Sequence, residues 1–130
     1  MTQDIATLPL RELTKMYLNL MKKMRKNIKI IENAERISTN GKHRYTFDFI
    51  IEDHQSGDLI GVIVKDWKRT LGVNVVLQFW KKIKDCGLTM GILIGTEFSE
   101  QARRRPLENI FLISRGELVS YLRSSDAEEM

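Results

Sequence analysis

Two apolar stretches separated by a short polar turn occupy residues 45–67. Aromatic or branched side chains recur at every second position of the first stretch: Tyr45, Phe47, Phe49 and Ile51. This period of two is typical of a strand with one apolar face. After the turn at 54–57, residues 59–67 are mostly apolar, as in the middle of a covered sheet. The pattern predicts an antiparallel hairpin in the core of a sheet.

The flanking segments predict an α/β fold with a mixed central sheet flanked by helices. Apolar residues at spacings of three and four indicate helices over 9–26 and 73–84. Ser99 and Pro106 delimit a short helix, and Ser114 with Glu117 has the spacing of a capping box before a last helix. Strands are expected over the following ranges: 28–37, 45–52, 59–67, 90–96 and 110–113. From residue 58 onward strands alternate with helices, which favours helices on both sides of the sheet.

Length and composition restrict the chain to a single globular unit. We expect one domain over residues 1–125 and an acidic, frayed tail over 126–130 within the 130 residues. The single cysteine, Cys86, excludes an internal disulfide framework. No apolar run reaches the roughly 20 residues of a membrane helix, and the first ten residues lack the pattern of a secretory signal. These features predict a cytoplasmic protein with no membrane contact.

Basic residues are unevenly distributed along the chain. Twenty-one Lys and Arg against seventeen Asp and Glu give a formal charge of +4. Ten basic and only three acidic residues lie between Arg11 and Arg44. Such clusters predict a polyanion such as DNA, although solvated basic faces are also common. The expected nucleic-acid contacts are Lys22, Lys23, Arg25, Lys26, Lys68, Arg69, Lys81 and Lys82.

Few residues are candidates for chemistry. The chain has no phosphate-binding loop, no dinucleotide fingerprint and no nucleophile elbow. His43 and His54 lack ligand spacing, and Cys86 has no activating partner in the sequence, so these three residues are interpreted as turn and packing residues.

The hairpin offers one pair of interest, Asp48 and Lys65. A turn centred near 55–56 makes the numbers of opposed residues sum to about 111, so Asp48 is expected opposite Ile63. Lys65 lies two residues further on, on the same face as Ile63. A carboxylate and an amine on one face suit the binding of a divalent ion and a phosphate. The competing interpretation makes Asp48 an ordinary strand residue and Lys65 a rim lysine.

An ordered set of motifs surrounds this pair. Asp48 is followed by a hairpin, a strand that ends in Lys65, a helix, the run GILI at 91–94 and FSEQA at 98–102. Over residues 45–120 this set resembles PD-(D/E)XK nucleases, especially Mrr-type restriction endonucleases and archaeal Holliday-junction resolvase-like proteins. The resemblance implies a restriction-endonuclease-like core, a Mg²⁺- or Mn²⁺-dependent hydrolase acting on DNA, and a homodimer. It assigns the metal to Asp48, a catalytic role to Lys65 and, on the first helix, a further acid to Glu12.

One position departs from the family pattern. Two residues before Lys65 the family has Glu or Gln, and this chain has Ile63, which provides no ligand oxygen. Three hypotheses follow: a DNA-binding member with weak or lost cleavage, an active endonuclease or junction resolvase with a carboxylate from elsewhere, and a non-enzymatic interaction module built on helix 9–26. If cleavage is lost, no cofactor is expected.

Overall fold

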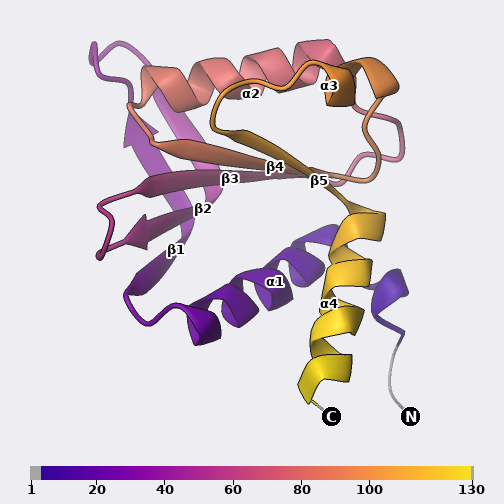
Figure 1. Ribbon diagram of the computed structural model, residues 1–130. Helices are drawn as coiled ribbons and strands as arrows, with labels where there is room; N and C mark the ends of the chain where they lie inside the picture. Colours follow the sequence, from indigo (N-terminus) through magenta and orange to yellow (C-terminus); the bar gives the residue numbers. More distant parts are fainter. Residues whose placement is uncertain (1–3, 130) are drawn as a thin grey trace.

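The computed structural model describes residues 4–129 and has one five-stranded sheet with helices on both faces (Figure 1). The strands lie in chain order across the sheet. They span Ile28–Ile37 (β1), Arg44–Asp53 (β2), Leu59–Lys65 (β3), Met90–Gly95 (β4) and Ile110–Ser114 (β5). The α-helices span Leu10–Met24 (α1), Val73–Asp85 (α2), Glu100–Arg104 (α3) and Arg115–Glu129 (α4), and Ile5–Thr7 forms a 3-10 turn.

The sheet is mixed, as the sequence predicts. β1, β2 and β3 are antiparallel neighbours, whereas β3, β4 and β5 run parallel. Parallel neighbours need a crossover connection, which α2 and α3 provide. In Figure 1, α2 and α3 cover one face of the sheet, and α1 and α4 cover the other. The expected α/β class and its order of elements are therefore confirmed.

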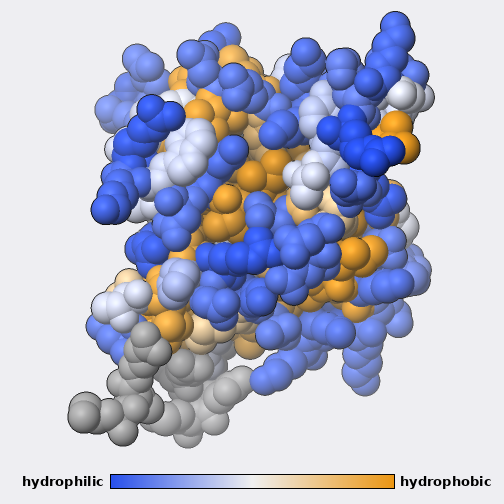
Figure 2. All heavy atoms as spheres, turned by 180° about the vertical axis from the view of Figure 1, so that it is seen from behind, coloured by the Kyte–Doolittle hydropathy of each residue, from blue (hydrophilic) through white to orange (hydrophobic). Residues whose placement is uncertain are grey.

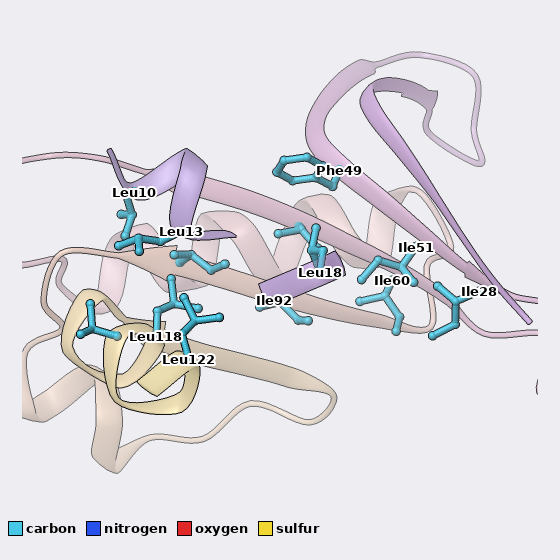
Figure 3. Packing of buried hydrophobic residues seen from close by; sticks show 13 residues of the cluster. Leu10, Leu13, Leu18, Ile28, Phe49, Ile51, Ile60, Ile92, Leu118 and Leu122 are labelled. Carbon is cyan, nitrogen blue, oxygen red and sulfur yellow. The ribbon is translucent and has the colours of Figure 1, made fainter. Parts of the chain in front are cut away.

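One core lies between the sheet and the pair α1 and α4 (Figure 3). Leu10, Leu13 and Leu18 of α1 meet Leu118 and Leu122 of α4 over the strands. Leu13 and Leu18 follow Leu10 by three and eight residues, and Leu122 follows Leu118 by four, so each set lies on one side of its helix. Burial of each leucine stabilises the fold by about 1.5–3 kcal/mol. This face is called the α1 face below.

The second core lies between the sheet and α2, on what is called the α2 face. Phe79 and Ile83 of α2 pack over Phe47 and Ile63. Gly91 of β4 allows this approach, because a Cβ atom there would lie 2.7 Å from side-chain atoms of Ile83 and Phe79. The missing side chain therefore sets how closely α2 approaches the sheet.

The side chains of β2 are expected to alternate regularly between the two faces of the sheet, and this expectation is wrong between Phe47 and Phe49. Phe47 packs on the α2 face, but Phe49 and Ile51 pack on the α1 face. A regular strand would place all three on one side of the sheet. The strand changes face at Asp48, between the two phenylalanines.

The neighbouring strand changes face at the same level. Asn33 of β1 lies between Glu32 and Ala34, which pair with Phe49 and Phe47, and it has a φ of 52°, in the left-handed region. Asn tolerates that region better than other side chains that carry a Cβ. Ile31 and Ala34, although three residues apart, consequently both pack on the α2 face. Together the two strands form a local twist at Asp48.

The chain ends in a helix. Ser114 and Glu117 form the expected capping box, since the Glu117 N–H donates to Ser114 Oγ at 3.2 Å and the Ser114 N–H donates to Glu117 Oε1 at 3.1 Å. α4 continues through Glu129, so the backbone expected as a frayed acidic tail is helical up to that residue. Met130 lies outside the described residues.

The face seen from behind in Figure 2 is largely hydrophilic at its margins, and hydrophobic residues are visible between the blue ones in its middle. Among residues 4–129, no helix has the length and apolar character needed to cross a bilayer.

Candidate functional site

The β2–β3 hairpin has the predicted register but opens before the predicted site. Its four ladder pairs run from Glu52–Leu59 to Phe49–Val62, and the residue numbers of each pair sum to 111. The ladder stops there, so Asp48 and Ile63 do not form the expected pair. Instead, the Val64 N–H donates to Asp48 Oδ2 at 2.7 Å. Because β2 changes face at Asp48, its carboxylate is directed sideways at β3 and takes the place of a backbone acceptor.

The other oxygen of Asp48 is bonded to Arg11, in the first turn of α1. Arg11 Nη1 lies 2.6 Å from Asp48 Oδ1. Arg11 Nη2 donates to Glu32 Oε1 at 3.1 Å and to Asn33 Oδ1 at 2.9 Å. The guanidinium carbon lies 4.9 Å from the centre of the Phe49 ring. These contacts join α1, β1 and β2, and we call Arg11, Glu32, Asn33 and Asp48 the Arg11 clasp.

The charges of the clasp stabilise one another. Burial by itself lowers the pKa of Arg11, but hydrogen bonds to Glu32 and Asp48 outweigh it and leave the pKa raised. The pKa of Glu32 is lowered by its hydrogen bonds with Arg11 and Lys15. The guanidinium is therefore a permanent cation at physiological pH.

Lys65 lies on the α2 face, near Trp67 and Lys82. Its Nζ atom is 4.9 Å from the centre of the Trp67 ring. The pKa of Lys82 on α2 is lowered by burial and by the nearby charge of Lys65. Within residues 4–129, no ion pair links Lys65 to Asp48. The structure therefore does not join the two hairpin residues in one contact.

The neighbouring acids also have other roles. Asp66 lies on the α1 side, where it accepts from the Leu10 N–H at 3.4 Å and pairs with Arg115 at 3.6 Å. Glu12 is exposed on α1, and no bond in the described part of the chain connects it to Asp48. Arg11, one residue earlier, has the place next to Asp48 that the resemblance assigns to Glu12.

Sequence reasoning misses the role of Arg11 because it counts this residue only as part of the basic segment. A signal was available. With Ile63 in place of a second metal-binding acid, Asp48 needs a protein cation to balance its charge, and Arg11 lies in the same helical turn as Glu12.

The residues present do not fit a divalent metal. Asp48 has both oxygens bonded within the protein, and Ile63 is 6% exposed and packs in the core of the α2 face. Mg²⁺ prefers several oxygen ligands in octahedral geometry. No cluster of three His, Cys, Asp or Glu side chains suited to a metal occurs in the described residues.

The expected nucleic-acid contacts fall into two groups on opposite faces of the sheet. Four lie at or just after the end of α1: Lys22, Lys23, Arg25 and Lys26. Arg25 of this group lies 3.8 Å from Asp53. The other four lie in the β3–α2 loop and on α2: Lys68, Arg69, Lys81 and Lys82.

Comparison with known families gives a match over most of the chain. The family model Mrr_cat, described as a restriction endonuclease, matches residues 5–122. The chain belongs to the Mrr-type restriction endonuclease family. The resemblance to PD-(D/E)XK nucleases is thereby confirmed. No curated protein matches the chain in sequence.

Two solved structures are similar to this Mrr-type chain, and the first shares its fold. A protein of unknown function, AF1548, superposes with a TM-score of 0.63 at 12% identity, over 85% of this chain and 66% of that protein. A repair endonuclease from Pyrococcus abyssi superposes with a TM-score of 0.49 at 18% identity, over 78% of this chain and 46% of the endonuclease. The chain thus spans about two thirds of the first protein and less than half of the second.

Proposed function

We propose that this chain is a DNA-binding member of the Mrr-type family in which phosphodiester cleavage is weak or lost. Family membership and the excess of basic residues support DNA as the partner. The observation that carries the loss of cleavage is the ion pair of Arg11 with Asp48 at 2.6 Å.

The physical argument is competition for one carboxylate. Arg11 already supplies a positive charge to Asp48, and a metal ion would have to displace it or share the carboxylate against like-charge repulsion. Ile63 provides no second oxygen, and Lys65 is held at Trp67. Asp48 then contributes to structure by joining α1, β2 and β3.

The test combines cleavage and binding. The protein is incubated with duplex, single-stranded and four-way-junction DNA in Mg²⁺ or Mn²⁺, and binding is measured by fluorescence anisotropy as salt rises from about 50 to about 200 mM. We expect DNA binding that weakens steeply with salt, and little or no cutting. Metal-dependent cutting that is abolished by Asp48→Ala and by Lys65→Ala would instead establish an active nuclease. Salt-independent association would contradict phosphate-driven binding.

An apolar groove favours a second candidate, a protein-interaction module. The groove has a volume of about 740 Å³, and its lining includes Met24, Phe111 and Tyr121, which are 70%, 53% and 46% exposed. It lies along β5, an edge strand of the sheet. This candidate predicts self-association through the groove. Light scattering should show that Met24→Glu or Phe111→Glu weakens a dimer, and a monomeric wild-type protein would reject the homodimer.

A further inference from the structure

A cluster of cations surrounds one indole ring on the α2 face. Lys65 Nζ lies 4.9 Å and the Arg69 guanidinium carbon 4.7 Å from the centre of the Trp67 ring. Trp67 is half-buried and packs against the α2-face core, so the ring is a fixed support. Lys82 of α2 is close enough to Lys65 for their charges to interact. We call these four residues the Trp67 patch.

The cations of the patch have no partner of opposite charge within the protein. In the part of the chain that the structure describes, no carboxylate forms an ion pair with Lys65, Arg69 or Lys82. Three exposed arginines elsewhere do pair with acids: Arg44 with Glu35, Arg104 with Glu100, and Arg123 with Asp4. The patch therefore brings three positive charges together beside one ring, without an acid of the described residues to pair with them.

The arrangement is unfavourable for the isolated protein. Burial and the like charge of Lys65 lower the pKa of Lys82, so this placement disfavours the charged form of Lys82. An external anion that contacts both amines would relieve this repulsion. The phosphates of a nucleic acid, which recur along a strand, match several cations spread over a few residues. The planar guanidinium of Arg69 adds a donor pair suited to one phosphate.

We propose that the Trp67 patch, on the α2 face, is where this protein binds the phosphate backbone of DNA, and that Lys65 acts there as a phosphate contact. The proposal rests on the proposed function, because it assumes that DNA is the partner. It assigns Lys65 to binding and leaves the Arg11 clasp, on the α1 face, to structure. The cations near the end of α1 then contribute less to affinity.

A matched pair of triple variants tests the proposal. K65Q/R69Q/K82Q removes the charges of the patch, and R44Q/R104Q/R123Q removes three cations that are paired with acids. Both variants change the net charge by the same amount. Affinity for a duplex and for a single strand is measured by anisotropy at several salt concentrations. We expect the patch variant to lose at least about 30-fold in affinity and about two to three units of the salt slope, while the control loses less than about 3-fold.

The outcomes separate this inference from the proposed function. If the wild-type protein does not bind DNA, the proposed function fails. If the wild-type protein binds but the patch variant binds equally well, or if K22Q/K23Q/K26Q loses as much as the patch variant, only the location fails. The duplex and single-strand arms show which form of DNA carries the contacted phosphates.

A second measurement tests the proposal even if the triple variants do not fold. In W80F, Trp67 is the remaining tryptophan, and its fluorescence should change in proportion to DNA bound. The single variant Arg69→Gln changes an exposed residue and should lower affinity about 3- to 10-fold with an unchanged melting temperature. Constant Trp67 fluorescence at saturating DNA, together with wild-type affinity in R69Q, would overturn the proposal.

Discussion

Arg11 Nη1 lies 2.6 Å from Asp48 Oδ1, so an arginine of α1 neutralises the acid to which the resemblance to PD-(D/E)XK nucleases assigns a metal. The two residues are 37 positions apart in the chain. The contact depends on the twist at Asp48, which directs the carboxylate between β2 and β3. It joins α1 to β2 and so contributes to the stability of the fold.

The stability of the Arg11 clasp can be measured. In Arg11→Gln, Asp48 and Glu32 lose their shared cation, and Asp48, whose side chain is 27% exposed, keeps a poorly solvated charge. We expect the free energy of unfolding to fall by about 1–2 kcal/mol in urea denaturation, less than for a fully buried pair. Lys15→Gln, which breaks only the more exposed pair with Glu32, should lower it by less than about 0.5 kcal/mol. Equal losses in the two variants would show that Asp48 does not depend on Arg11.

Reversing the charge at Arg11 should create a metal site. Arg11→Glu adds a carboxylate where Asp48 and Glu32 now converge on one guanidinium, which supplies oxygen ligands for a divalent ion. We expect this variant to be destabilised without metal and to gain about 3 °C or more in melting temperature with saturating Mn²⁺. Wild type and Arg11→Gln should show no such gain. A Mn²⁺-dependent gain in wild type would show that the natural site holds the ion.

The sequence allowed the hairpin register and the fold class to be predicted. A short polar turn leaves few ways to pair 45–53 with 59–65, and the sum of 111 follows from its centre. The capping box at Ser114 and Glu117 is also a local signal, because both partners lie within one turn of the helix.

The direction of the Asp48 side chain could not be predicted in the same way. Strict alternation places Phe47 and Phe49 on one face, and a single left-handed residue on another strand, Asn33, accompanies the change of face. The partnership of Arg11 depends on how α1 is rotated about its axis, which tertiary packing of Leu10 and Leu13 fixes. Residue spacing within a single segment shows neither the change of face at Asp48 nor the rotation of α1.

The conformation of Asn33 provides a test of that twist. Asn33→Ala keeps a Cβ atom at a φ of 52° and removes the amide oxygen that accepts from Arg11. Asn33→Gly removes the same acceptor but tolerates the left-handed backbone. We expect the alanine variant to be about 1 kcal/mol less stable than the glycine variant in chemical denaturation. An alanine variant at least as stable as the glycine variant would contradict the left-handed assignment.

Acid should weaken the junction of β5 and α4 through Glu117. Burial by itself raises the pKa of Glu117, but hydrogen bonds from Arg103 and Ser114 outweigh it and hold the pKa below its ordinary value. Because the folded pKa lies below the unfolded one, the stabilisation is fully present above the unfolded pKa. It is lost as the pH falls through the folded pKa.

Glu117→Gln should therefore lower the free energy of unfolding near neutral pH and flatten its decline between about pH 5 and about pH 3. Glu100→Gln, which affects an exposed pair with Arg104, is the control and should leave that decline unchanged. If E117Q and wild type decline in parallel, the capping carboxylate does not contribute to the acid sensitivity of the fold.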